Sequence, residues 1–136
     1  MGERQSIGIG VMGLGVVGGG VAKALMERSE AIASLVGCPL TLRRILVRHP
    51  AKKRGVKVSR RLLTTDPWQI IEDQEIDIVV ELIGGESPAL EFIRQALLRG
   101  KHVVTANKEV MAKHGAELLS LAREKGVDIL YEASVG

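Results

Sequence analysis

Residues 7–20, IGIGVMGLGVVGGG, decide the fold of this 136-residue chain. The stretch begins with apolar residues typical of a buried strand, continues through G-x-G-x-x-G from Gly13 to Gly18, and runs into a helical pattern. Gly13 permits a tight turn, Gly15 lets a pyrophosphate approach the backbone, and Gly18 allows the helix to pack closely on the sheet. Unpaired N–H groups at the start of such a helix favour a negatively charged ligand. The stretch predicts a dinucleotide-binding turn, with an unliganded glycine turn as the alternative.

The composition indicates a globular domain with an aliphatic core. Hydrophobic residues make up 46% of the chain and aromatic residues only 2%, which suits buried parallel strands and disfavours a nucleic-acid surface built on aromatic stacking. Cys38 is the single cysteine, so we expect neither an internal disulfide nor a cysteine metal site. No signal peptide or membrane span is recognisable, and we expect a cytoplasmic protein that binds neither membranes nor nucleic acid.

Strand and helix patterns alternate along the chain. The pairs Asp66-Pro67 and Ser87-Pro88 predict helix starts, Asn107 predicts a helix N-cap, and Gly100 and Gly126 predict helix ends. The expected strands are 7–12, 40–47, 62–64, 76–83, 101–105 and 127–131, and the expected helices are 16–33, 67–73, one between 88 and 100, and 108–125.

This alternation predicts an α/β fold, a Rossmann-type doubly wound parallel sheet of about six strands with helices on both faces. No repeat or linker divides the sequence, so we expect residues 1–136 to form one NAD(P)-binding domain. Residues 132–136 follow the last strand without a closing helix, which leads us to expect a truncated domain.

The residues after the second strand indicate which nicotinamide nucleotide is bound. A carboxylate there bonds the ribose 2′-OH of NAD, whereas an arginine pairs with the 2′-phosphate of NADP. Here the strand ends at Arg48, and no carboxylate follows before Asp66. Residues 43–61 hold nine lysines and arginines and no acid, a local positive field suited to a phosphate. We expect Arg48 to contact the 2′-phosphate, with a solvated basic loop as the alternative. Secondary candidates nearby are His49, Lys52, Lys53 and Arg54.

A second cluster lies in residues 100–109, GKHVVTANKE, where a strand ends and a helix begins. Ligands of open α/β sheets bind along this carboxyl edge. Lys108 falls in the first helical turn, where the helix dipole disfavours a structural cation, so we expect it to meet an anion or a substrate hydroxyl, with a pKa lowered further if it is buried. Ile83-Gly84-Gly85 ends the preceding strand and suggests close approach of the nicotinamide ribose. Glu81 needs a partner if it is buried, and the sequence leaves its role open.

These blocks together resemble homoserine dehydrogenase. The resemblance covers essentially the whole chain in order and is most specific in GKHVVTANK (100–108) and YEASVG (131–136). One departure is His49, because the family often has an acid directly after the arginine, and this difference favours NADP further.

The resemblance implies a role for each matching position. The chain would be the cofactor domain of an oxidoreductase that interconverts homoserine and aspartate 4-semialdehyde, a step toward threonine and methionine. Its cofactor would be NADP, with NAD as the alternative, and a sodium site would begin at Glu132 and Val135. Lys108 would be catalytic and would also touch the cofactor. The implied cofactor-binding residues are Gly13, Leu14, Gly15, Val16, Val17, Gly18, Arg48, Ile83, Gly84, Thr105 and Lys108.

The resemblance also implies that the substrate and dimerisation domain is absent, so that this fragment binds the nucleotide but is inactive alone, and that the full-length protein is a homo-oligomer. Three alternatives stay open. One is another Rossmann dehydrogenase acting on an amino acid or aldehyde, against which residues 105–108 argue. Another is a non-catalytic nucleotide sensor, for which Arg48 has the wrong charge. The third is a fragment that binds nothing.

Overall fold

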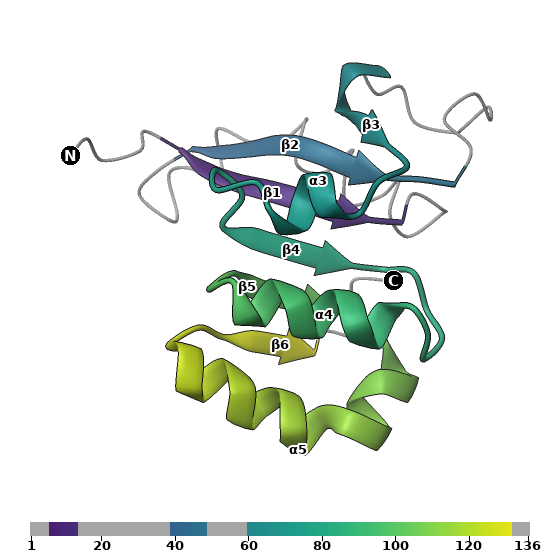
Figure 1. Cartoon of the computed structure of the whole chain (residues 1–136), viewed down its shortest axis with the longest axis vertical. Coiled ribbons are helices and arrows are strands. Elements are labelled where there is room, and N and C mark those ends of the chain that lie inside the picture. Colours follow the sequence, from purple (N-terminus) through teal and green to yellow (C-terminus); the bar gives the residue numbers. More distant parts are fainter. Residues whose placement is uncertain (1–5, 14–38, 49–59, 132–136) are drawn as a thin grey trace.

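The computed structural model describes residues 6–13, 39–48 and 60–131. Its centre is one sheet of six parallel strands in the order β3-β2-β1-β4-β5-β6, and the labelled arrows of β1, β2, β4 and β6 point the same way in Figure 1. The strand order reverses between β1 and β4, as in folds that bind dinucleotides at that switch point. The expected α/β fold is confirmed. The strands are β1 (Ile7–Met12), β2 (Leu40–Leu46), β3 (Leu63–Thr64), β4 (Ile78–Glu81), β5 (His102–Thr105) and β6 (Ile129–Tyr131).

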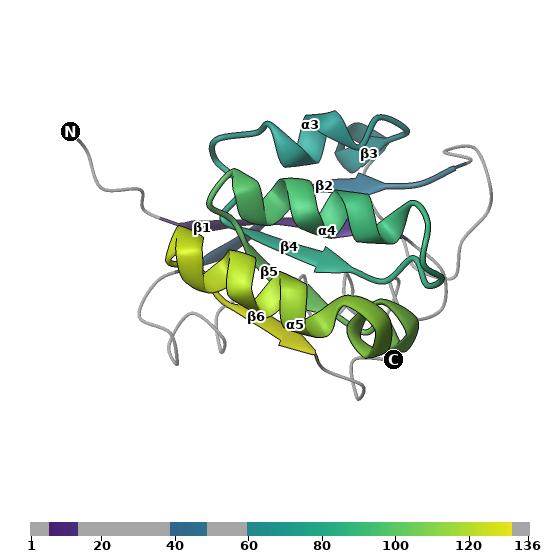
Figure 2. The ribbon, with the colours of Figure 1, turned by 60° about the horizontal axis from the view of Figure 1, so that its bottom comes forward.

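The helices of the described ranges cover one face of the sheet (Figure 2). They are α3 (Trp68–Ile71), α4 (Ala89–Leu98) and α5 (Lys108–Lys125), and a short 3-10 helix, η1 (Arg60–Leu62), precedes β3. Their apolar side chains pack with residues of the strands, including Met12, Val79 and Val103. A second apolar cluster lies around Ile9, Val11, Ile45, Val47 and Val80. The helix expected over 16–33 and the basic loop at 49–59 lie outside the described residues.

Close packing between β1 and the loop that carries α3 depends on glycine. A Cβ atom at Gly10 would lie 2.6 Å from Cγ2 of Ile70, and one at Gly8 would lie 1.8 Å from the carbonyl oxygen of Glu75. Val11 and Met12 of the same strand are fully buried. The central strand therefore combines bulky buried residues with glycines where the Glu75 backbone or the Ile70 side chain approaches closely.

Most helix boundaries agree with the expectations. The side chain of Asn107 caps α5 by accepting a hydrogen bond from the Val110 N–H at 3.0 Å. Asp66 Oδ1 accepts one from the Trp68 N–H at 3.0 Å, but the N-cap position of α3 falls on Pro67, one residue later than expected. Gly100 and Gly126 have φ angles of 77° and 69°, the left-handed conformation that ends a helix. None of the described helices has the length and apolar composition of a bilayer-spanning segment.

Some boundaries are wrong. Ser87 does not cap α4, because the N-cap position falls on Pro88 and no side chain bonds there. The helix expected over 67–73 spans only Trp68–Ile71. The strand expected over 76–83 is shorter at both ends, and the Ile76 N–H donates to the Asp73 carbonyl in the preceding turn. The strands expected over 101–105 and 127–131 begin later, because the Lys101 and Val127 amides donate to the Ala96 and Ala122 carbonyls of the preceding helices.

Candidate functional site

Gly13, directly after β1, touches the loop after β4 at the carboxyl edge of the sheet. Gly13 has a φ of 101°, and a Cβ atom there would lie 3.3 Å from the backbone of Leu82 and Ile83. The Leu82 N–H donates to the Met12 carbonyl at 2.9 Å, and the Gly13 N–H donates to the Leu46 carbonyl at 3.0 Å. The start of the glycine pattern is therefore held at the switch point between β1 and β4.

A buried carboxylate organises the ends of β4 and β5. Glu81 has no solvent-exposed surface, and Thr105, also fully buried, donates its hydroxyl to Oε1 of Glu81. The other oxygen, Oε2, accepts hydrogen bonds from the Ile83 N–H at 2.9 Å and the Gly84 N–H at 3.4 Å. Ile83 therefore leaves the sheet because its N–H bonds a side chain instead of a neighbouring strand, and this is why β4 ends at Glu81.

Asn107 connects this carboxylate to the start of α5. Its side-chain amide donates to Glu81 Oε2 at 3.4 Å and to the Gly85 carbonyl at 2.7 Å. Its backbone N–H donates to the Thr105 hydroxyl at 3.0 Å, while its side-chain oxygen caps the helix. The loop after β4 and the first turn of α5 are thus fixed relative to each other.

Lys108 is the first residue of α5 and is exposed. The burial that we considered from the sequence is therefore wrong for the chain in this structure. Among the described residues it forms no hydrogen bond or ion pair, unlike Lys113 one turn further along, which pairs with Glu86 and Glu109. The Lys108 side chain is therefore available to a ligand at the carboxyl edge of the sheet.

The backbone between β4 and α4 offers an open surface to a ligand. Gly84 and Gly85 are exposed and have φ angles of 83° and 74°. Among the residues that the structure describes, a Cβ atom at either glycine would meet nothing within 4 Å. Ile83 beside them is half-buried. These residues fit a nicotinamide nucleotide, because a flat group can approach the backbone without meeting a side chain.

Arg48 lies on the opposite side of β1 from this loop, two residues beyond the end of β2, and is exposed. The Val47 N–H just before it donates to the Thr64 carbonyl at 2.8 Å, which ties the end of β2 to β3. The sheet order places the arginine on the β2 side of the switch point and Ile83, Gly84 and Lys108 on the β4 and β5 side.

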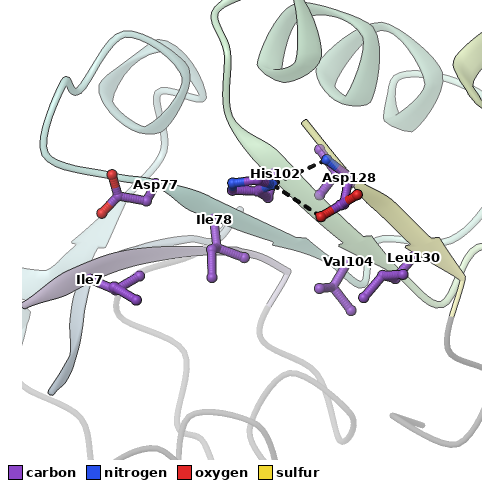
Figure 3. Close-up of a pocket in the computed structure, with 8 residues that line it drawn as sticks. Ile7, Asp77, Ile78, His102, Val104, Asp128 and Leu130 are labelled. Carbon is purple, nitrogen blue, oxygen red and sulfur yellow. Dashed lines mark hydrogen bonds and ion pairs between the residues drawn. The ribbon is translucent and has the colours of Figure 1, made fainter. Parts of the chain in front are cut away.

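The two histidines of the described ranges lie outside this edge cluster. His114 on α5 places Nε2 2.6 Å from Oε2 of Glu86, and this hydrogen bond, together with the charge of Lys113, lowers the pKa of the Glu86 carboxyl. His102 accepts a hydrogen bond from the Asp128 N–H at 3.1 Å. It faces a groove of about 480 Å³ at the amino ends of the strands, away from the predicted site (Figure 3).

The remaining predicted site residues fall outside the described ranges. They are Leu14, Gly15, Val16, Val17 and Gly18 of the glycine pattern, and Glu132 and Val135 of the expected cation site. Within the ranges 6–13, 39–48 and 60–131, no group of three or more His, Cys, Asp or Glu side chains could hold a metal ion.

Sequence reasoning missed the roles of Glu81 and Asn107 in joining the parts of the site. The signal available for Glu81 was an acid in the strand sequence Ile-Val-Val-Glu, since a buried carboxylate requires several donors. Asn107 was recognised as a cap, but its bonds to Glu81 and Gly85 depend on the sheet order.

Comparisons with known proteins agree with this fold. The family described as "Homoserine dehydrogenase, NAD binding domain" matches residues 13–132. The chain is 44% identical over 131 residues to a homoserine dehydrogenase of Bacillus subtilis (strain 168) and 42% identical over 131 residues to one of Pseudomonas aeruginosa, in each case over 96% of this chain and 30% of the relative. It spans about a third or less of the length of such relatives.

Solved structures give the same result. A homoserine dehydrogenase crystal structure from S. aureus superposes with a TM-score of 0.88 at 40% identity, covering 95% of this chain and 33% of that one. One from Thiobacillus denitrificans has a TM-score of 0.84 at 44% identity, covering 95% and 30%. Since the family match extends over most of the sequence and the strand order agrees with it, the chain belongs to the NAD-binding domain family of homoserine dehydrogenases.

Proposed function

We propose that this chain is the nucleotide-binding part of a longer homoserine dehydrogenase, which oxidises L-homoserine to aspartate 4-semialdehyde with NAD(P)+. The observation that carries the proposal is the meeting of Gly13, the open Gly84-Gly85 backbone and exposed Lys108 at one edge of the sheet. The parts of the enzyme that bind homoserine and form an oligomer would lie in the remaining two thirds of the relatives' length. On this proposal the chain alone binds the nucleotide without turnover.

Each end of the dinucleotide has its own residues. The turn from Gly13 to Gly18 would hold the pyrophosphate, because backbone N–H groups at a helix start bind anions. Arg48 would bind the 2′-phosphate of the adenosine ribose, which favours NADP over NAD. Ile83, Gly84 and the end of β5 at Thr105 would line the nicotinamide half. The Thr105 hydroxyl is already engaged with Glu81 and Asn107, so its contribution would come from the position of its backbone.

The nicotinamide ring, when bound, accepts or gives up the hydride. Lys108 would act at the substrate oxygen, where an ammonium stabilises the alkoxide that develops and a neutral amine accepts the hydroxyl proton. Its place in the first turn of α5, at the carboxyl edge of the sheet, puts it beside the open Gly84-Gly85 backbone where the substrate would meet the nicotinamide.

Further proposals for this protein rest on the family and the sequence. A sodium ion would bind near Glu132 and Val135. The protein would be cytoplasmic, in keeping with its single cysteine at Cys38. The full-length enzyme would form a homo-oligomer and would bind neither membranes nor nucleic acid.

The test is homoserine-dependent reduction of NADP+ by the full-length protein, followed by the absorbance of NADPH. We expect turnover with homoserine and none with homoserine omitted. A full-length protein that binds NADPH but never oxidises homoserine would contradict the proposed reaction and would favour a nucleotide sensor.

A further inference from the structure

We propose that Glu81 is a positioning residue for the nicotinamide half of the site, a role that rests on the proposed function. Its carboxylate touches neither the open surface nor Lys108. It acts through the groups that it binds, the Ile83 and Gly84 amides, the Thr105 hydroxyl and the Asn107 side chain.

The Glu81 carboxylate is fully buried. A carboxylate without exposed surface is costly unless its lone pairs are bonded, and all four donors of Glu81 are neutral groups of the protein. Two come from the backbone of the loop after β4, and two come from side chains at the β5–α5 junction. An apolar residue at position 81 would fill the same space but could not accept these hydrogen bonds. The carboxylate therefore serves to join the two segments.

The two segments joined by Glu81, the loop after β4 and the start of α5, carry the residues that face the proposed ligand. The loop side of the network carries Gly84 and Gly85, and the helix side carries Lys108 directly after Asn107. Within the described ranges, no atom lies within 4 Å of the Cβ position of either glycine to support the loop from outside. The hydrogen bonds beneath the loop therefore set where its backbone lies relative to the lysine.

The Thr105 hydroxyl needs a hydrogen-bond acceptor at position 81. Thr105 donates to Glu81 and at the same time accepts from the Asn107 N–H, so its hydroxyl is used at both ends. In a Glu81→Gln variant, one of the two side-chain positions becomes a donor that faces either the Ile83 N–H or the Thr105 hydroxyl. In the first case the Ile83 N–H loses its acceptor, and in the second the Thr105 hydroxyl proton loses its acceptor, although the side chain keeps its shape.

The test compares two nucleotides in the full-length protein. NADPH reaches both halves of the site, whereas 2′-phospho-ADP-ribose lacks the nicotinamide ring. The variants are Glu81→Gln and Thr105→Val, with Thr105→Ser as the conservative partner that keeps the hydroxyl. Lys101→Met is the matched control, because Lys101 is also buried and donates to the Asp73 and Ile76 carbonyls, but at the amino end of β5.

We expect Glu81→Gln and Thr105→Val to weaken NADPH binding by about tenfold or more, which corresponds to about 1.4 kcal/mol. Binding of 2′-phospho-ADP-ribose should change by less than about twofold. Thr105→Ser should bind NADPH like the parent, and Lys101→Met should lower the unfolding midpoint while leaving both affinities unchanged. A double variant at Glu81 and Thr105 should lose less than the sum of the two single losses, because both remove the same network.

Three outcomes would overturn the inference. The first is unchanged NADPH affinity in both variants, and the second is an equal loss for both nucleotides. The third is loss of NADPH affinity in Lys101→Met, which would show a general effect of stability. If Glu81→Gln does not fold, the Thr105→Val and Thr105→Ser pair decides alone. A parent protein that binds neither nucleotide would instead remove the proposed function, and with it this role.

Discussion

Lys108 is the residue on which the proposed chemistry depends most. It lies in the first turn of α5, is exposed, and is unpaired among the described residues. A lysine that only stabilised the helix would lie more favourably at the other end, where Arg123 and Lys125 are found. Its position is therefore better explained by a ligand than by the stability of α5.

We expect Lys108→Ala to lower kcat for homoserine by about 10²- to 10⁴-fold, the usual contribution of a positioned acid or base. The unfolding midpoint should be almost unchanged, since the side chain is exposed and unpaired among the described residues. Lys125→Ala, at the far end of the same helix, is the control and should retain full turnover. Full activity of the Lys108→Ala enzyme would contradict the role proposed for this lysine.

For single residues, the sequence could predict a candidate site residue such as Lys108, but not the hydrogen bonds of Glu81 that position the loop beside it. Lys108 was predictable because its place after Asn107 is visible in the chain. The partners of Glu81 were not, because Thr105 and Asn107 come 24 and 26 residues later. Only the parallel pairing of β4 with β5 brings these side chains together.

Among the elements, β1 and α5 show opposite uses of glycine. Gly8 lies where a side chain would collide with the Glu75 backbone, whereas a Cβ atom at Gly115 of α5 would meet only the end of the Met111 side chain, at 3.6 Å. The first glycine allows two segments to approach each other. The second costs helix stability, because glycine has a lower helix propensity than alanine.

The two alanine substitutions should therefore change stability in opposite directions. We expect Gly8→Ala to lower the free energy of unfolding by about 1–3 kcal/mol or more, and Gly115→Ala to raise it by about 0.5–1 kcal/mol. Urea unfolding followed by circular dichroism measures both. A neutral Gly8→Ala variant would mean that β1 does not lie against the Glu75 carbonyl.

The link between α5 and the loop before α4 has a titratable component. The hydrogen bond from His114 and then the charge of Lys113 hold the pKa of the Glu86 carboxyl below its usual value of 4.5. A carboxyl with a lowered pKa stabilises the folded form above 4.5, and this contribution is lost as the pH falls through the lowered pKa. Glu86 is partly exposed, so solvent screening keeps the contribution small.

We expect His114→Ala to raise the pKa of Glu86 toward 4.5, because it removes the largest cause of the shift. Lys113→Gln should raise it as well, because it removes a nearby positive charge and a hydrogen bond. An NMR titration of the Glu86 side-chain carbonyl follows both changes. A Glu86 pKa that is the same with and without His114 would show that the two side chains do not bond in solution.

For the whole molecule, the alternation of strand and helix patterns was enough to predict the parallel sheet. The glycine pattern from Gly13 to Gly18 and the capping residues predicted six strands and a doubly wound fold, because these local signals mark where each element begins. The lengths of β4, β5 and β6 did not follow, since the amides at their ends bond helices or side chains instead of strands. The carboxyl end of β4, where the Ile83 N–H bonds Glu81, forms part of the site, so the detailed geometry there required the structure.

The central claim is that the carboxyl edge binds a nicotinamide dinucleotide with Arg48 at the adenosine end. Calorimetric titration of the protein with NADPH and, separately, with NADH at the same low salt tests it most directly. We predict that NADPH binds at least about tenfold tighter, a difference of about 1.4 kcal/mol. Equal affinity for the two nucleotides would contradict the role of Arg48, and binding of neither would contradict the site itself.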